Sequence, residues 1–140
     1  MKFMLIVHHN EDAFEKMDKE TQSQLLTESI ELTHQLHATG QYVHASPLHP
    51  AATAVIVRVR EDTPLVTDGP FIETKEILGG YWIIEVASLA EAIAWARKAP
   101  CPAGEMIEIR EVYTPEDFGP EVAAIERRQM DQMAEQEKKA

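Results

Sequence analysis

Two short segments of this chain are apolar on both sides of a β-strand, and they constrain the fold more than any other feature. Residues 2–8 read KFMLIVH and residues 80–86 read GYWIIEV, so apolar side chains point both ways from each strand. A strand that is apolar on both faces lies in the middle of a sheet and is covered on both sides. Both segments are therefore predicted to be central strands.

The segments between these strands show other periodicities. Residues 21–39 are predicted to form a helix, because leucines recur at helical spacing, Thr21 and Gln24 fit a capping box and Gly40 fits a C-terminal cap. Alternation and turn residues predict the remaining elements: a strand at 42–48, a hairpin at 53–67, a helix that opens at Ser88 and ends before Pro100, and a strand at 106–112. The second helix is expected to present a core stripe of Leu89, Ala92, Ile93 and Ala96.

This order of elements predicts an α+β fold of the ferredoxin-like βαββαβ type, with an extra β-hairpin and both helices on one face of an antiparallel sheet. The other sheet face would then be bare, although the central strands are apolar on both sides. Large exposed apolar patches are rare in monomers, so the bare face is predicted to meet a second copy in a two-fold homodimer. Such a dimer encloses a cleft between the subunits, where ligands tend to bind. Residues 1–113 are predicted to form this domain.

Residues 114–140 have a different character and are predicted to be a C-terminal helical extension. Thr114 followed by Pro115 is a typical helix start, and the segment beyond Glu121 is strongly charged with a thin apolar stripe. Two fates are open for this helix. It is either a solvated surface helix, the usual fate of polar helices, or a segment that docks on a partner subunit.

The composition bounds the partners and the compartment. The chain has 140 residues and a formal net charge of −11, which disfavours nucleic acid and anionic membranes as partners. Its apolar opening is too short for a signal sequence or a membrane span. Cys101 is the only cysteine, so no intrachain disulfide is expected, and a cytoplasmic location is predicted. With no base beside it in sequence, Cys101 is expected to be a structural thiol rather than a nucleophile.

The segment 67–80, TDGPFIETKEILGG, carries the strongest candidates for a functional site. Asp68 precedes Gly69 and Pro70, which restrict the backbone and could aim its carboxylate into the cleft as a catalytic group. The alternative is that Asp68 only caps a turn through its own side chain. The double glycine at 79–80 predicts a close approach by another backbone or by a ligand.

Further residues around this segment are candidates for ligand binding: Phe71, Glu73, Lys75, Glu76, Tyr81 and Trp82. The charged members could contact a substrate or form an ion-paired loop that positions the dimer. Tyr81 and Trp82 are adjacent on a strand and point to opposite faces. Each is expected to pack in the core unless it faces the cleft, where it would form a wall for an apolar or aromatic ligand.

Six histidines raise the question of metal binding, but their spacing matches no metal-site signature, so no metal or other cofactor is expected. His8 is a candidate proton carrier, because it ends the first central strand and could open onto the cleft near Asp68. Its neighbour His9 should point to the opposite face. His34 and His44 are the other candidates for a proton carrier.

The chain resembles the YCII-related superfamily, in the branch named after its Asp-Gly-Pro-Phe motif. The resemblance rests on DGPF at 68–71, continued by ETKE at 73–76 and GGY at 79–81. It extends over most of residues 1–113, including the opening KFML, the VRVR stretch at 57–60, the segment 82–96 and EIR at 108–110. The resemblance implies a dimeric α/β barrel built from ferredoxin-like units.

The resemblance also carries expectations about function. Some relatives are thought to use a His–Asp pair in the cleft for acid–base or elimination chemistry, with the histidine on the first helix. Here Ser29 occupies that position, and a serine cannot carry a proton near neutral pH as histidine does. The prediction is a protein that binds a small molecule in the inter-subunit cleft, with weak lyase-like acid–base activity left open. Because members are often encoded beside extracytoplasmic-function sigma factors, the alternative is a non-enzymatic regulatory interaction module that partners a sigma factor in a stress response.

Overall fold

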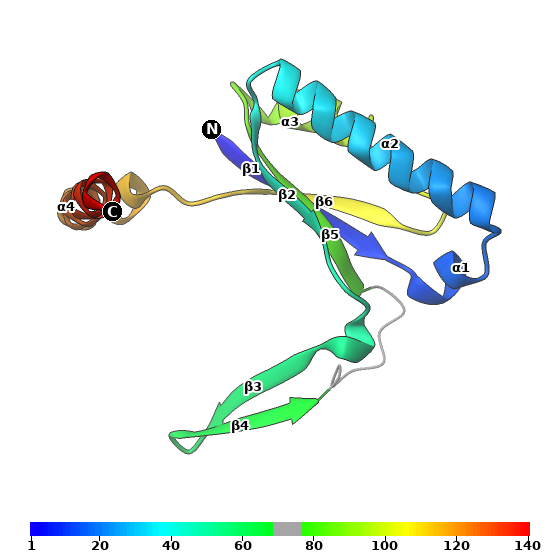
Figure 1. The fold of residues 1–140 in the computed structure, drawn as a ribbon, viewed down its shortest axis with the longest axis horizontal. Helices are drawn as coiled ribbons and strands as arrows, with labels where there is room; N and C mark the ends of the chain where they lie inside the picture. The colour runs from blue at the N-terminus through cyan, green and yellow to red at the C-terminus, as the bar shows by residue number, and fades with distance from the viewer. Residues whose placement is uncertain (69–76) are drawn as a thin grey trace.

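The computed structural model describes residues 1–68 and 77–140, and it shows an antiparallel sheet with helices on one side and two projecting arms (Figure 1). In chain order the elements are β1 Lys2–His9, α1 Glu11–Glu15, α2 Lys19–Ala38, β2 Tyr42–Pro47, the 3-10 helix η1 Ala51–Thr53, β3 Val55–Arg60, β4 Thr63–Asp68, β5 Ile77–Glu85, α3 Leu89–Ala96, β6 Met106–Glu111, the 3-10 helix η2 Pro115–Phe118 and α4 Pro120–Lys139. The predicted mixed α+β class is confirmed.

The main sheet has four strands in the order β2-β5-β1-β6, and each neighbouring pair is antiparallel. The two strands predicted to be central, β1 and β5, are the central pair. Leu5 of β1 lies opposite Trp82 on one side and Ile109 on the other, which fixes the register across the sheet. The predicted hairpin is confirmed as a separate two-stranded sheet of β3 and β4.

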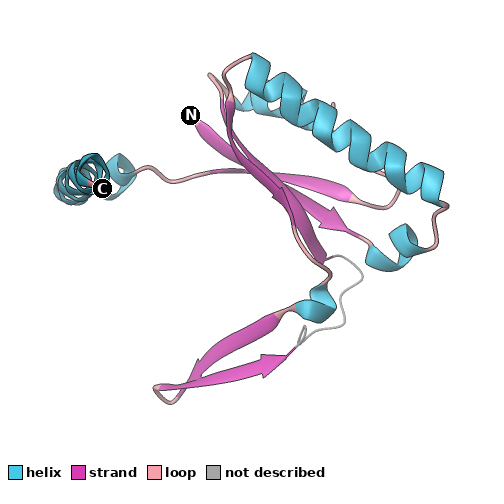
Figure 2. Cartoon of the chain, in the orientation of Figure 1, coloured by secondary structure: helices cyan, strands magenta, loops and turns pink. Residues whose placement is uncertain are grey.

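Helices α2 and α3 cover one face of the sheet (Figure 2). Strand alternation turns Phe3 and Leu5 toward these helices, where Leu5, Leu36 and Ile84 are fully buried. Trp82 is also in this core, 7% exposed, and its indole N–H donates to Thr33 Oγ1 at 3.0 Å. Trp82 is thus a core residue on the helix-covered face, which removes it from the candidate ligand contacts.

The helix starts differ from the predictions in two places. Helix α2 is capped by Asp18, not Thr21, because the Asp18 carboxylate accepts from the Thr21 backbone N–H at 2.7 Å. That bond lowers the pKa of Asp18. Helix α1 was not predicted, since five residues are too few to show a helical period; Asn10 caps it by accepting from Ala13 N at 3.0 Å. Gly40 has φ +73°, as the predicted C-terminal cap requires.

The predicted core stripe of α3 is wrong for two of its members. Leu89 is 50% exposed and Ile93 is 36% exposed, whereas Ala92 and Trp95 are buried. A small side chain at Ala92 lets the helix approach the sheet, and the indole ring of Trp95 fills the space beside it. Trp95 can be buried because its N–H has a partner outside the helix, which the spacing of apolar residues does not reveal.

Gln41 is that partner, and it links α3 to the loop before β2. Its side-chain oxygen accepts from Trp95 Nε1 at 2.9 Å, and its nitrogen donates to Glu91 Oε1 at 2.6 Å. The second oxygen of Glu91 accepts from the Ala87 backbone N–H at 2.9 Å. The Ala87 bond, and secondarily the Gln41 bond, lower the pKa of Glu91.

Two arms extend from the body: the β3–β4 hairpin and α4 (Figure 1). The hairpin turns through Glu61 and Asp62, which both have positive φ, as a tight two-residue hairpin turn requires. Its valines at 55, 57, 59 and 66 are all more than half exposed. In α4 Ala123 is the buried residue, and Val122, Ile125, Met130 and Met133 are exposed. Within the described ranges, no helix is both long and apolar enough to cross a membrane.

Candidate functional site

The face of the sheet opposite α2 and α3 has a partly exposed apolar centre. It consists of Met4 and Ile6 from β1 and Tyr81 and Ile83 from β5, and we call this surface the open face. Met4 lies opposite Ile83 and Ile6 lies opposite Tyr81, so the four side chains form one continuous strip. Alternation along the two central strands produces this strip, because their other side chains form the core.

A histidine–tyrosine pair borders the open face on the β2 side. Tyr81 Oη lies 2.9 Å from His44 Nδ1, a hydrogen-bonding distance. The two rings are stacked, with an interplanar angle of 24° and centroids 5.7 Å apart. Which atom donates depends on the tautomer of His44. The exposed imidazole of His44 is thus hydrogen-bonded to the half-buried phenol of Tyr81 at the edge of the apolar strip.

A second histidine pair borders the open face on the β6 side. His8 Nε2 lies 2.9 Å from Glu108 Oε1, and the other oxygen of Glu108 lies 3.8 Å from Arg110 Nε. Glu108 is directly opposite Ile6 in the β1–β6 register, so this charged group lies beside the apolar strip. The open face is therefore an apolar strip between two histidine-containing pairs.

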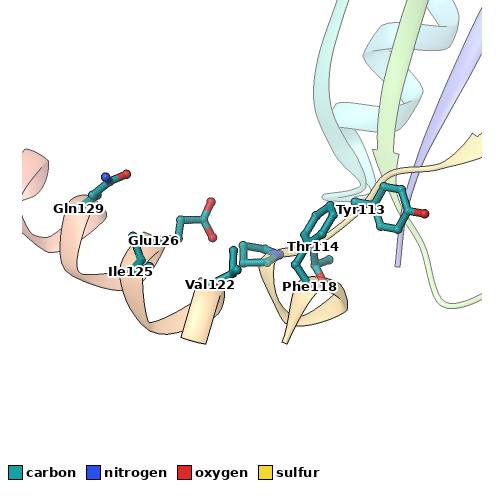
Figure 3. Close-up of a pocket in the computed structure, with 8 residues that line it drawn as sticks. Tyr113, Thr114, Phe118, Val122, Ile125, Glu126 and Gln129 are labelled. Atoms are coloured by element: carbon teal, nitrogen blue, oxygen red, sulfur yellow. The ribbon is translucent and has the colours of Figure 1, made fainter. Parts of the chain in front are cut away.

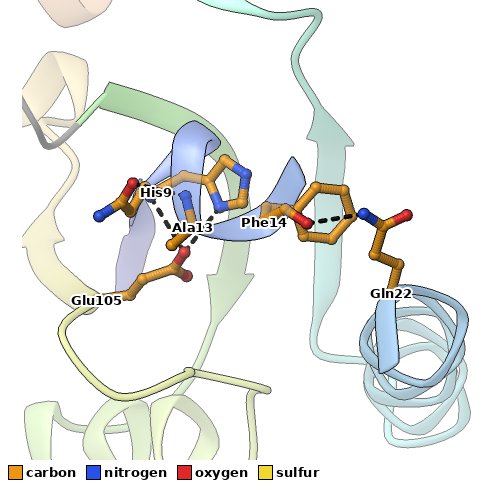
Figure 4. Close-up of polar contacts among 6 residues, drawn as sticks. His9, Ala13, Phe14, Gln22 and Glu105 are labelled. Atoms are coloured by element: carbon orange, nitrogen blue, oxygen red, sulfur yellow. Dashed lines mark hydrogen bonds and ion pairs between the residues drawn. The ribbon is translucent and has the colours of Figure 1, made fainter. Parts of the chain in front are cut away.

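His9 points to the opposite side of the sheet, as predicted, and has a structural role (Figure 4). Its Nδ1 lies 3.0 Å from Glu105 Oε1, and its ring packs edge-on against Phe14 with centroids 5.3 Å apart. The same carboxylate oxygen accepts from the Asn10 backbone N–H at 3.0 Å. Because the Glu105 side chain is only 6% exposed, these bonds tie the end of β1 and helix α1 to the start of β6.

The predicted close approach at the double glycine is confirmed, and the approaching groups belong to the chain itself. A Cβ on Gly80 would lie 3.0 Å from the Ser46 carbonyl oxygen on β2. A Cβ on Gly79 would lie 2.5 Å from His9 Cβ on β1, beside the register shift between Val7 and His8. The two glycines let β5 pack closely between β1 and β2 at the end of the sheet that carries His8 and His9.

Asp68 is exposed at the end of β4, opposite Val55 of the hairpin. Within residues 1–68 and 77–140, no histidine forms a hydrogen bond with Asp68, and His8 is bonded to Glu108 instead. The catalytic roles of Asp68 and His8 therefore stay predictions. The candidate contacts Phe71, Glu73, Lys75 and Glu76 lie outside the described residues.

The remaining candidate groups have other partners. Ser29 Oγ donates to the Leu25 carbonyl at 3.0 Å, so its hydroxyl is used within α2. His37 stacks on Tyr42 with centroids 3.9 Å apart. Partial desolvation, and secondarily Glu105, raise the pKa of the Cys101 thiol, which disfavours the nucleophilic thiolate. In the described part of the chain, no three His, Cys, Asp or Glu side chains are grouped to hold a metal ion.

A groove lies away from the open face, between η2 and the start of α4 (Figure 3). Tyr113 and Phe118 pack with ring centroids 4.9 Å apart, and Val122 and Ile125 continue the apolar lining along α4. Among the described residues, those predicted for a catalytic or ligand-binding site, Asp68, His8, Tyr81 and Trp82, are not part of its lining. Its open and mostly apolar lining suits a helix or another apolar segment better than a small polar ligand.

Sequence reasoning identified His8, Tyr81 and His44 individually but not the pairs that they form. Glu108 was missed as a site residue, although it lies in the EIR stretch of the last strand. Alternation within β6 would have placed Glu108 and Arg110 on one face. Its pairing with His8 joins residues 100 positions apart, and no local pattern predicts that.

Comparison with known proteins relates this chain to one family. Residues 1–116 match the sequence model of the YCII-related domain. An uncharacterised protein of Rhizobium meliloti (strain 1021) is 29% identical over 97 residues, which cover 69% of this chain and 78% of that relative. A similar solved structure is 5-chloro-2-hydroxyhydroquinone dehydrochlorinase (TftG) from Burkholderia phenoliruptrix in complex with 2,5-dihydroxybenzoquinone. It has a TM-score of 0.47 and 15% identity, and the match covers 81% of this chain and 96% of that one.

Proposed function

Because the chain belongs to the YCII-related family, we propose that it is a small homodimeric protein that binds a small molecule at its open face, in a cleft completed by a second subunit. The observation that carries this proposal is the apolar strip between the His44–Tyr81 and His8–Glu108 pairs. Apolar surface with a few convergent polar groups is the usual composition of a ligand site. The single cysteine fits a cytoplasmic protein.

The strand order supports the dimeric part of the proposal. Order β2-β5-β1-β6 with α2 and α3 on one face is that of a ferredoxin-like unit, and two such units facing each other would close a dimeric α/β barrel. The valines of the hairpin are exposed to water, and the apolar residues of the open face are partly exposed. A two-stranded hairpin is marginal on its own, so both surfaces are expected to gain stability from the second copy.

The chemistry proposed for this site is weak acid–base catalysis of the lyase type. A histidine on the open face would carry the proton, since Ser29 cannot. Asp68 would anchor the ligand from the base of the hairpin, and the loop that follows it would supply further contacts through Phe71, Glu73, Lys75 and Glu76. The support for these roles is that the loop joins β4 to β5, the strand that carries Tyr81 and Ile83.

A thermal-shift panel of small aromatic acids and phenols tests the proposal. A compound present at 100 times its Kd is expected to stabilise the wild type by about 2.7 kcal/mol. Amide NMR shifts should then concentrate at Met4, Ile6, Tyr81 and Ile83. Asp68→Asn should reduce the stabilisation, whereas Asp62→Asn, a matched change at the other end of the hairpin, should not. The proposal is wrong if no compound stabilises the wild type, or if the shifts map to α2. Equal stabilisation of wild type and Asp68→Asn removes Asp68 from the site.

A second candidate function is that of a regulatory interaction module that partners a sigma factor without chemistry. The observation that favours it is α4, which projects from the body with an exposed apolar stripe and a groove at its start (Figure 3). An exposed amphipathic helix is a common docking element for a regulatory partner. In this case the open face would serve the homodimer, and α4 would bind the partner.

Removal of residues 114–140 tests the second candidate. The truncated chain 1–113 is expected to stay a dimer and to lose capture of a purified extracytoplasmic-function sigma factor from its host. In the full chain, Ile125→Lys should weaken capture in the same way, since it places a charge in the apolar stripe of α4. Capture that survives both changes contradicts this function, as does a full-length chain that captures no such factor.

A further inference from the structure

We propose that His44 and Tyr81 are the proton-transfer pair of the open face, and that the ligand is an uncharged ring compound with a weakly acidic hydroxyl, such as a phenol or an enol. This inference rests on the proposed function, because it requires the open face to bind a small molecule. It adds the residue that accepts the proton, the residue that positions it, and the chemical class of the ligand.

The geometry of the two histidines distinguishes their roles. In His8 the outer ring nitrogen, Nε2, is already bonded to Glu108 at 2.9 Å. In His44 the inner nitrogen, Nδ1, is bonded to Tyr81, and no group among the described residues bonds to Nε2. When Nδ1–H donates to Tyr81 Oη, the lone pair of Nε2 is available as a base. His44 therefore presents its outer ring nitrogen as the base, whereas in His8 only the inner nitrogen, Nδ1, has no bonded group among the described residues.

Tyr81 fixes the orientation of that base in two ways. In the proposed arrangement its hydroxyl accepts the hydrogen bond from Nδ1–H of His44, which holds Nε2 as the base. Its ring stacks on the imidazole at an interplanar angle of 24°, which limits rotation of the imidazole. Tyr81 is thus a positioning residue for His44, and its own ring also forms part of the apolar strip.

The charges around the strip indicate the ligand class. Glu108 is near Arg110, and Lys2 lies opposite Glu85 on the same side of the sheet, so positive and negative side chains are balanced there. The whole chain has a net charge of −11, which repels anions. Among the described residues of the open face, a phosphate or carboxylate would find no excess of positive charge. A neutral ring that rests on Ile6 and Ile83 and presents a hydroxyl to His44 matches the surface better.

The proposed step balances without another reactant. The O–H bond of the ligand breaks, and its proton forms a new N–H bond at His44 Nε2. The electron pair stays on the ligand oxygen, which becomes a phenolate or enolate beside the imidazolium. The Nδ1 proton of His44 remains hydrogen-bonded to Tyr81 Oη, so the positive ring keeps a partner at its inner nitrogen.

The probe for this step is 4-nitrophenol, because its phenolate absorbs at longer wavelength than its phenol. Below the pKa of the free probe, binding to the wild type is expected to increase the phenolate band. His44→Gln should bind the probe without that increase. Tyr81→Phe should lower the phenolate-to-phenol ratio about fivefold, as expected for the loss of one neutral hydrogen bond. His49→Gln, a histidine change in the exposed segment after β2, should behave as the wild type.

Amide NMR shifts at the open face measure binding separately from ionisation, and so distinguish two failures. If the probe binds there and ionises equally in His44→Gln, this inference is wrong while the proposed function stands. If it does not bind there, the ligand class is wrong, and the wider thermal-shift panel decides the proposed function.

Histidine ¹⁵N spectra of the folded proteins add a ligand-free test. The Nδ1–H tautomer is expected for His44 in the wild type and should decrease in Tyr81→Phe; a dominant Nε2–H tautomer in the wild type overturns the proposal.

Discussion

Ile6→Glu is expected to convert the proposed homodimer into a monomer. Ile6 is at the centre of the open face, between Tyr81 and Glu108 in the neighbouring strands. In a dimer that buries this face, the new carboxylate would lose water and lie beside an existing carboxylate. An unpaired charge at a buried interface costs about 2–5 kcal/mol, and the two-fold axis imposes that cost twice. Light scattering over a range of protein concentrations would measure the change in mass.

Ile30→Glu is the matched control for this experiment. It introduces the same side chain on α2, where Ile30 is 58% exposed on the helical layer. The dimer is expected to persist in this variant, and circular dichroism should show that both variants keep their secondary structure. A dimer that survives Ile6→Glu at micromolar concentration contradicts burial of the open face. A wild type that is already monomeric contradicts the homodimer itself.

The elements that the sequence predicted well are those with a long or clear period. Runs that are apolar on both faces identified the central strands, and alternation identified the hairpin. The two-residue period of a strand also placed His8 and His9, and Tyr81 and Trp82, on opposite faces. Errors occurred where a contact distant in sequence decided the outcome. Trp95 replaced Leu89 and Ile93 in the core because Gln41, on another element, satisfies its indole N–H. Asp18 replaced Thr21 as the cap because the first helical turn began earlier.

The candidate site was predictable as separate residues but not as an arrangement. The sequence indicated that His8, His44 and Tyr81 carry useful chemistry, and alternation could assign each to a face. The sequence could not indicate that β2 pairs with β5, or that their register places His44 within hydrogen-bonding distance of Tyr81. Strand register depends on the packing of the whole sheet. For the same reason the sequence indicated His8 only as a candidate proton carrier near Asp68, and it could not indicate that His8 is bonded to Glu108 across β1 and β6.

Gly79→Ala is expected to cause a large loss of stability, because the space for a Cβ is already occupied. The added atom would lie 2.5 Å from His9 Cβ, a distance that requires one strand to move. His9 cannot simply rotate away, since its Cβ is fixed to the backbone and its ring is held by Glu105 and Phe14. Overpacking of this kind typically costs about 1–3 kcal/mol, and the loss of the His9 contacts adds to that cost. Urea unfolding at one fixed protein concentration would measure the free energy of unfolding.

Gly40→Ala separates the crowding effect from the general cost of replacing a glycine. Gly40 has φ +73° and no atom within 4 Å of the position of an added Cβ, so only backbone strain of about 1–2 kcal/mol is expected there. Gly79 has no positive φ, and its cost arises from the contact with β1. The loss of stability in Gly79→Ala should therefore exceed that in Gly40→Ala, and the amide signals of His9 and Asn10 should shift only in Gly79→Ala. An equal or smaller loss would mean that β1 and β5 separate at little cost, and that the glycine is not required for the close packing of these strands beside the open face.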